Sequence, residues 1–147
     1  RPYRTMFAAR TAKGQRQIKL GSVDPTRDFN FVLDTVAGFI KALEANEGFG
    51  EVINLGSNFE ASIGHVAQLI AEVMGADIEI TTDAQRIRPK ESEVERLWAC
   101  NAKAKRVTGW QPNYDSLEGL TKGLQQTVDW FTCSSNLAGY KSDRYNL

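Results

Sequence analysis

Polar and apolar residues repeat with two periods along this chain, and the two periods predict alternating strands and helices. Alternation over residues 17–20, and short β-favouring runs at 51–55 and 78–80, predict strands. Apolar residues spaced three and four apart predict three helices, each with one buried face. Those faces are Val36, Phe39, Ile40 and Leu43; Ile63, Val66, Leu69, Ile70 and Val73; and Leu117, Leu120, Leu124, Val128 and Phe131. Elements that alternate in this way indicate an α/β layer domain.

Residues 27–35 join a predicted strand directly to the first of these helices. The strand is short, aromatic and β-branched, and Arg27 stands at its start, where a side chain can reach out of the fold. Asp34 is predicted to be the N-cap of the helix, because a carboxylate there can accept hydrogen bonds from free backbone N–H groups. This junction is the stretch around which we expect the domain to be organised.

The remaining helix ends carry recognisable signals. Gly109 is predicted to end a small helix, and residues 5–13 predict another short helix that stops before a glycine. Residue types that favour helix starts stand at Ser62, at Asn101, and at Asp115 with Glu118 three residues later.

Length and charge limit the classes of function. A chain of 147 residues supports one domain, which we expect to span residues 1–147 with a lead-in over 1–13 and a tail over 133–147. Eighteen basic residues balance eighteen acidic ones, so no excess charge draws the protein to nucleic acid or lipid. No apolar run is long enough to cross a membrane. Since the chain opens on Arg1 rather than methionine, we expect it to be incomplete.

The cysteines indicate a reducing compartment, and we expect a cytoplasmic protein. Only Cys100 and Cys133 are present, without the spacing of a metal site. Cys100 lies in an apolar stretch and is predicted to be a small core residue.

The sequence contains no recognisable catalytic constellation. It lacks a glycine-rich turn opening a helix, a Tyr-x-x-x-Lys pair and a phosphate-binding Walker loop. The single histidine, His65, lies on the polar side of a predicted helix and is expected on the surface. One histidine and scattered carboxylates do not form a metal site. Binding is therefore easier to predict for this chain than catalysis.

Two arginines provide the strongest binding signal. Arg27 and Arg88, if brought together in space, match a diphosphate, because each guanidinium offers a planar fork of donors to phosphate oxygens. For Arg27 the alternative is a surface charge paired with Asp28 or Asp34. For Arg88 the alternative is one more cation in a loop that is basic anyway.

Asn54 and Leu20 are weaker candidates for the same site. Asn54 ends a predicted strand, where its amide can meet a ligand or satisfy backbone groups. Leu20 and the loop after it can shelter a flat base or form part of the core.

Several motifs of this chain occur together in one order: Arg27-Asp28-Phe29-x-Phe31-Val32-x-Asp34, Asn54-Leu55-Gly56, Arg88-Pro89 and Gly109-Trp110-x-Pro112. In this order they resemble the C-terminal half of the extended short-chain dehydrogenases/reductases, which are NAD-dependent nucleotide-sugar epimerases and dehydratases. Residues 51–57 and 92–97 are most similar to the branch of UDP-N-acetylglucosamine 4,6-dehydratases, and residues 140–146 resemble the C-terminus of that branch.

The resemblance implies a fold and a set of roles. The fold is a small mixed sheet with flanking helices, which forms the substrate domain of such enzymes. Arg27 and Arg88 match arginines that contact the substrate diphosphate, Asn54 matches a nearby asparagine, and Leu20 belongs to the lining of the nucleoside pocket. NAD and the catalytic groups belong to an N-terminal domain that is absent from this sequence, so we expect no cofactor in this chain.

We therefore expect the nucleotide-sugar-binding half of a 4,6-dehydratase or epimerase, without catalytic activity of its own. The expected ligand is a nucleotide sugar, and UDP is the expected nucleotide. The expected partner is a missing NAD-binding half or further copies of the chain. The alternative is an orphan binding or scaffold module that associates with itself through apolar surface left open.

Overall fold

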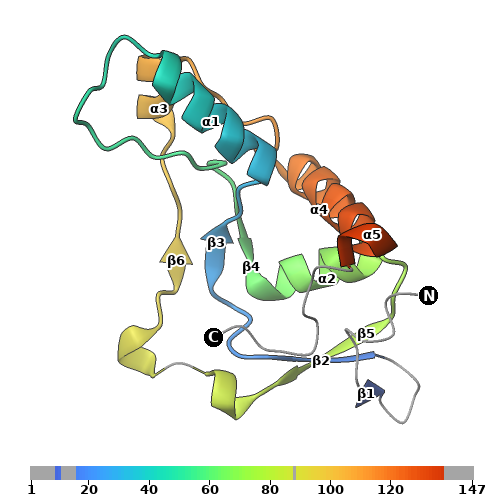
Figure 1. Cartoon of the computed structure of the whole chain (residues 1–147). Coiled ribbons are helices and arrows are strands. Elements are labelled where there is room, and N and C mark those ends of the chain that lie inside the picture. The colour runs from blue at the N-terminus through green and yellow to red at the C-terminus, as the bar shows by residue number, and fades with distance from the viewer. Residues whose placement is uncertain (1–8, 11–15, 88, 138–147) are drawn as a thin grey trace.

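Two small sheets and the helices that flank them make up the fold (Figure 1). The computed structural model of the chain describes residues 9–10, 16–87 and 89–137. Each sheet has three strands, in the order β1–β2–β5 and β4–β3–β6. The strands are β1 (Ala9–Arg10), β2 (Arg16–Leu20), β3 (Thr26–Asp28), β4 (Glu60–Ser62), β5 (Ile78–Thr82) and β6 (Arg96–Leu97).

Both sheets are mixed, as the predicted fold class requires. In the first sheet β2 pairs parallel with β5, with Ile18 opposite Ile80, and antiparallel with β1. In the second, the central strand β3 pairs antiparallel with β4 and parallel with β6. The strand predicted over residues 17–20 is thereby confirmed as β2, and that over 78–80 as β5.

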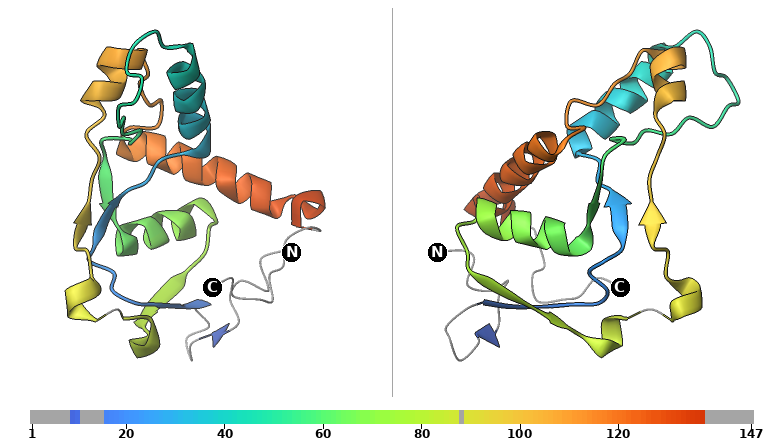
Figure 2. Two further views of the ribbon diagram at one scale, coloured as in Figure 1. Left: turned by 60° about the vertical axis from the view of Figure 1, so that its left-hand side comes forward. Right: turned by 180° about the vertical axis from the view of Figure 1, so that it is seen from behind.

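The helices lie around these sheets (Figure 2). In Figures 1 and 2, α1 and α3 lie at one end of the molecule, and β2 and β5 lie at the other. No helix within the described ranges is both long and apolar enough to span a membrane. The helices are α1 (Val32–Glu44), α2 (Ile63–Val73), α3 (Ala102–Thr108), α4 (Leu117–Thr132) and α5 (Ser134–Leu137), with single 3-10 turns at Ala84–Arg86 and Lys90–Ser92.

The core lies where α2 packs against α4 and β4. Val66 and Leu69 on α2 and Leu120 on α4 are buried together with Ala61. Partly buried apolar residues surround them, namely Phe29, Phe59, Ile70 and Leu124. The apolar face predicted for α2 therefore faces the interior.

Serine hydroxyls cap both core helices. The Ser62 Oγ accepts a hydrogen bond from the backbone N–H of His65 at 3.1 Å, which confirms the predicted cap of α2, and His65 is exposed as expected. The helix α4 begins one residue later than predicted, because the Ser116 Oγ, and not Asp115, accepts from the Gly119 N–H at 3.1 Å. A hydroxyl at the N-cap satisfies a donor that the helix itself leaves free.

The segment 51–55 is not a strand, contrary to the prediction. Its backbone N–H groups from Val52 to Leu55 donate to no described residue, and Val52 is 83% exposed. Ile53 and Leu55 are half-buried, and Leu55 packs against Gly38 of α1, where an added Cβ would lie 2.6 Å from a Leu55 methyl. A β-favouring sequence forms a ladder only beside a neighbouring strand. The described part of the chain supplies no such neighbour.

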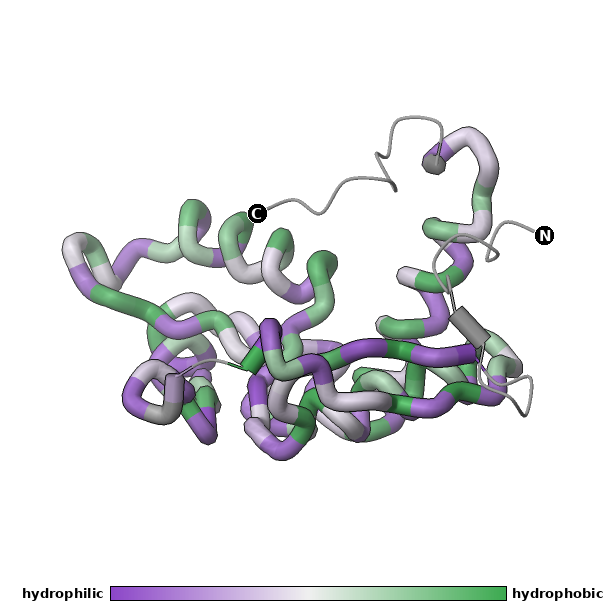
Figure 3. The backbone as a smooth tube through the Cα atoms, turned by 90° about the horizontal axis from the view of Figure 1, so that it is seen from below, coloured by the Kyte–Doolittle hydropathy of each residue, from purple (hydrophilic) through white to green (hydrophobic). Residues whose placement is uncertain are grey.

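The helix α1 is the second departure from expectation. Its predicted buried face is open: Val36 is 47% exposed, Phe39 62%, Ile40 49% and Leu43 87%. In Figure 3, which colours the backbone by hydropathy, hydrophobic stretches recur along the turns of α1. The amphipathic pattern was sufficient to form the helix, but nothing in the described structure covers the apolar side.

Two smaller predictions also fail. The helix predicted over residues 5–13 is wrong at Ala9–Arg10, which form β1 because they pair with β2, while the rest of that prediction lies outside the described residues. Cys100, predicted to lie in the core, is exposed in the irregular segment between β6 and α3.

Candidate functional site

The two acidic residues of the 27–35 motif fix the surroundings of Arg27. Asp28, at the end of β3, accepts hydrogen bonds from the Ser57 N–H at 2.8 Å and the Ser57 hydroxyl at 2.5 Å. Its other oxygen accepts from the backbone N–H groups of Asn58 at 3.1 Å and Ala99 at 3.3 Å. Charge-assisted bonds of this kind are stronger than neutral ones. Asp28 thus holds two distant segments against the central strand.

Asp34, in the first turn of α1, also binds a distant segment of the chain, and it is not the N-cap that the sequence predicted. The cap position is Phe31, whose side chain makes no capping bond, and Asp34 lies three residues into the helix with 1% exposure. Its carboxylate accepts from the backbone N–H groups of Asn113 and Tyr114 at 3.0 Å, and its carbonyl accepts from the Trp110 Nε1 at 3.0 Å. The carboxylate therefore anchors the loop before α4 instead of its own helix end.

Arg27 pairs with neither Asp28 nor Asp34. Its Nη1 donates to the carbonyl of Thr26 at 2.7 Å, and its Nη2 donates to the Glu93 Oε1 at 3.3 Å. The side chain of Arg27 is 20% exposed and that of Glu93 is 21% exposed. The Arg27 Nε has no acceptor among the described residues. The guanidinium is held beside solvent with part of its donor capacity unused.

Leu20 lies where β2 ends, beside the turn that leads to Arg88. The Leu20 carbonyl accepts from the Asp83 N–H at 2.7 Å, and Gly21 lies against the carbonyl of Arg86, where any side chain would collide. Leu20 itself is half-buried. The predicted nucleoside-pocket residue and the turn before Arg88 are therefore neighbours.

The structure brings together only part of the predicted site. Arg88 lies outside the described residues, so its convergence with Arg27 stays a prediction. Asn54 is exposed and makes no hydrogen bond with another described residue. It is linked to Arg27 only indirectly, because Asp28 holds Ser57 three positions further along the chain.

The sequence did not predict the contact of Glu93 with Arg27 or the hydrogen bonds that Asp28 accepts. Glu93 stands 66 positions from Arg27, and no spacing rule connects them. The sequence motif that contains Asp28 indicates a surface partner for Arg27, but not the backbone donors that the Asp28 carboxylate meets. Those donors, on Ser57, Asn58 and Ala99, belong to segments that only the fold brings together.

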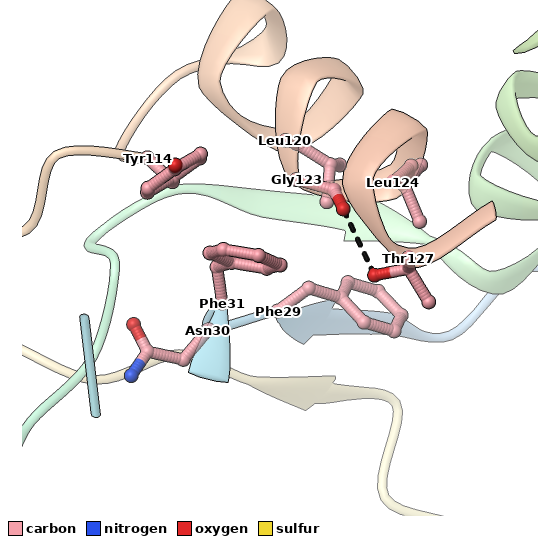
Figure 4. A pocket seen from close by; sticks show the side chains of 8 residues that line it. All are labelled: Phe29, Asn30, Phe31, Tyr114, Leu120, Gly123, Leu124 and Thr127. Atoms are coloured by element: carbon pink, nitrogen blue, oxygen red, sulfur yellow. Dashed lines mark hydrogen bonds between the residues drawn. The ribbon is translucent and has the colours of Figure 1, made fainter. Parts of the chain in front are cut away.

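An apolar pocket of about 130 Å³ opens between α4 and the segment that follows β3 (Figure 4). It is lined by Phe29, Asn30, Phe31, Tyr114, Leu120, Gly123, Leu124 and Thr127. The Asn30 amide donates to the Thr35 hydroxyl at 2.7 Å, whereas its buried Oδ1 has no hydrogen-bond partner among the described residues. The residues that line the pocket include no Asp, Glu, Lys, Arg or His.

The described residues do not fit NAD or a metal ion. The helices α2 and α4 begin at capping serines, and none of the described helices follows a glycine-rich turn of the kind that cradles a dinucleotide phosphate. No cluster of three or more His, Cys, Asp or Glu side chains suited to a metal exists among these residues.

Comparison with known proteins identifies relatives that share this fold. The family model of GDP-mannose 4,6 dehydratase matches residues 3–123. A UDP-glucose 4-epimerase of Mycolicibacterium smegmatis is 32% identical, over 86% of this chain but only 36% of that enzyme.

Solved structures agree with the family match. A UDP-glucose 4-epimerase of Thermotoga maritima with UDP-glucose superposes with a TM-score of 0.67 at 26% identity, over 89% of this chain and 37% of that one. A UDP-glucuronic acid 4-epimerase of Bacillus cereus, in complex with UDP-glucuronic acid and NAD, gives a TM-score of 0.65 at 26% identity, over 80% and 35%. This chain spans about a third of the length of the relatives that it matches.

Proposed function

This chain belongs to the GDP-mannose 4,6 dehydratase family of nucleotide-sugar epimerases and dehydratases, and we propose that it is the nucleotide-sugar-binding part of such an enzyme. The proposal rests on the position and contacts of Arg27. It lies on the central strand of the second sheet, its guanidinium is held by the Thr26 carbonyl, and its Nε, which has no acceptor among the described residues, would serve a ligand. A fixed guanidinium with donors to spare suits a diphosphate.

The other predicted residues complete this site. Leu20 offers apolar surface to a nucleoside at the end of β2, and the turn beside it leads to Arg88, which would add a second cation. Asn54 would contribute an amide from the segment that Asp28 holds near β3. We infer that a UDP-sugar is the ligand, since UDP-sugars occupy two of the solved relatives.

We infer that the chain does not catalyse a reaction alone. Its described residues offer no seat for NAD, and its sequence contains no Tyr-x-x-x-Lys pair. Catalysis would need an NAD-binding part, which this chain would meet through surface that is now open. The bare face of α1 and the unpaired segment 51–55 support such a contact, because both lack the layer that normally covers them.

The alternative function, a self-associating scaffold module, rests on the same open face of α1. Exposed apolar residues in one stripe favour association with a second copy when no other partner is present. In that case the protein would keep its fold while the site around Arg27 binds nothing.

Calorimetric titration distinguishes these functions. UDP and UDP-N-acetylglucosamine are titrated into the natural chain, into Arg27→Ala, and into Arg106→Ala as a control for loss of an exposed arginine far along the chain on α3. Loss of one charge-assisted contact, about 1.5–3 kcal/mol, should weaken binding roughly 10- to 100-fold in Arg27→Ala only. Equal binding by both variants, or no binding by the natural chain, would contradict the proposal.

A further inference from the structure

The apolar pocket between α4 and the segment after β3 is not used by the proposed function (Figure 4). Three aromatic rings line it, those of Phe29, Phe31 and Tyr114, and the ring centroids of Phe31 and Tyr114 lie 4.5 Å apart. Leu120 and Leu124 on α4 also line it, and both pack in the core. The pocket is therefore a hollow at the edge of the core, between aromatic rings and a helix.

Contacts within the protein hold the walls of this pocket. The Tyr114 N–H donates to the Asp34 carboxylate at 3.0 Å, and the Tyr114 hydroxyl accepts from the Gln126 amide at 2.9 Å. The Lys122 Nζ lies 5.7 Å from the centroid of the Tyr114 ring. The Phe31 carbonyl accepts from the Asp34 N–H at 3.0 Å. Walls that are already in place spare a ligand the free-energy cost of ordering them.

Gly123 leaves room for a ligand on the α4 side. A Cβ built there would lie 3.0 Å from the Phe31 Cδ2, which is closer than most carbon contacts, so any other residue would press on the Phe31 ring. Thr127, one helical turn further on, lines the pocket and is exposed, so it lies at the mouth.

The lining offers a ligand apolar contact and little else. It contains no ionisable Asp, Glu, Lys, Arg or His. The Thr127 hydroxyl donates to the Gly123 carbonyl at 2.9 Å, and the Tyr114 hydroxyl is engaged by Gln126. In Figure 4 the Asn30 amide points away from α4. A charged ligand would lose its hydration here without gaining a partner, so the pocket suits an uncharged one.

The volume of the pocket, about 130 Å³, limits the ligand to a single ring. Pockets for drug-sized molecules hold about 300–1,000 Å³, so a nucleotide sugar is too large for this one. An apolar cavity of about 150 Å³ in another protein binds benzene. Aromatic walls add offset and edge-to-face contacts that favour an aromatic ring over an aliphatic one.

We propose that this pocket binds the uncharged, six-membered aromatic ring of a small molecule. The ring lies against Phe29, Phe31 and Tyr114 on one side and against Gly123 of α4 on the other. Binding needs neither Arg27 nor a phosphate, so this site stands or falls independently of the nucleotide-sugar site.

The first test is a titration of the natural chain with benzene, followed by two-dimensional amide NMR. The amide signals of Gly123, Leu124 and Thr127 should shift and saturate, with a dissociation constant on the order of 1 mM, as befits six carbon atoms. Benzoate, which adds a charge to the same ring, should bind about tenfold more weakly or worse. A lack of saturable shifts with benzene, or equal binding of benzoate, would overturn the proposal.

Variants of α4 locate the ring. Thr127→Leu adds bulk at the mouth of the pocket and should weaken benzene binding about tenfold. Thr121→Leu is the matched control, because the Thr121 hydroxyl also donates to the carbonyl four residues earlier, at 2.8 Å, but Thr121 does not line the pocket. Gly123→Ala, which presses on the Phe31 ring, should weaken binding as well. Equal benzene affinities of Thr127→Leu and Thr121→Leu would place the ring elsewhere and refute the site.

Two further probes identify the kind of ligand. N-acetyl-phenylalaninamide carries the same ring on a peptide backbone, and it should bind no more tightly than benzene because the lining offers its amides no partner. Tighter binding would assign the pocket to a protein segment and overturn the small-molecule proposal. UDP should leave the benzene affinity unchanged, whether or not UDP itself binds. Displacement of benzene by UDP would show that the two sites are one.

Discussion

The helices α1 and α2 have similar sequence patterns, but the apolar face of α2 is buried and that of α1 is exposed. Each carries a stripe of branched or aromatic residues on one face, and each comes after a strand of the same sheet, α2 directly after β4 and α1 three residues after β3. On α2 the stripe is covered by α4, and Val66 and Leu69 are each 7% exposed. On α1 the stripe is bare, with Phe39 62% exposed. An amphipathic pattern therefore specifies which face of a helix needs a partner, but not whether the chain supplies one.

The largest expected effect is the difference in stability lost when one apolar residue of each helix is truncated. Leu69→Ala should lower the free energy of unfolding by about 2–5 kcal/mol, because it leaves a cavity in the core beneath α4. Phe39→Ala should change that free energy by less than about 0.5 kcal/mol, because the ring is already in solvent. Urea unfolding followed by circular dichroism measures both. Similar losses in the two variants would mean that α1 is covered in solution.

The second effect concerns the part of α1 that is well anchored. Asp34→Ala should cost about 1–3 kcal/mol, because the N–H groups of Asn113 and Tyr114 lose their acceptor. Glu44→Ala, at the exposed end of the same helix, loses only a surface pair with Lys41 and should cost less than about 1 kcal/mol. The same unfolding experiment applies. An Asp34 variant as stable as the Glu44 variant would show that the anchor contributes nothing.

The third effect tests whether the bare face finds a partner. We expect the natural chain to associate with itself through α1, and Ile40→Glu to raise the dissociation constant about tenfold or more by placing a charge in the contact. Gln68→Glu adds the same charge to the exposed side of α2 and serves as the control. Sedimentation velocity over a range of concentrations measures the effect. A natural chain that is monomeric at high concentration would exclude association through α1.

The smallest effect lies at the strand that leads into α2. The Arg96 guanidinium, with help from the Thr26 hydroxyl, lowers the pKa of Glu60 from its usual value. A carboxylate with a lowered pKa in the folded state adds stability above its unfolded pKa and loses it as the pH falls through the folded value. Glu60→Gln should therefore flatten the decline in stability between about pH 5 and pH 3. Thermal unfolding across this range would show an unchanged decline if the pair is without effect.

Much of the fold was readable from the sequence because its signals are local. The spacing of Val66, Leu69 and Ile70 predicts α2, and Ser62 marks its start. Gly109, with a φ of 71°, ends α3 as predicted, since glycine adopts this left-handed conformation without strain.

What could not be read depends on partners that are distant in sequence. Residues 51–55 have the composition of a strand, yet a strand exists only beside another strand. Aspartate is a residue type that favours the N-cap of a helix, yet the Asp34 carboxylate accepts from backbone donors 79 and 80 positions away. Glu93 in the candidate site is of the same kind, since no local pattern distinguishes it from the other acids of its loop.

The bond between Asp34 and Asn113 also sets an order of events during synthesis. A ribosome adding about 5–20 residues per second needs roughly 4–16 seconds to pass from Asp34 to Asn113. Throughout that interval α1 can be helical, but the Asp34 carboxylate has no backbone donors to accept from. In the nascent chain α1 should therefore stay loosely attached until the C-terminal third emerges and ties it down.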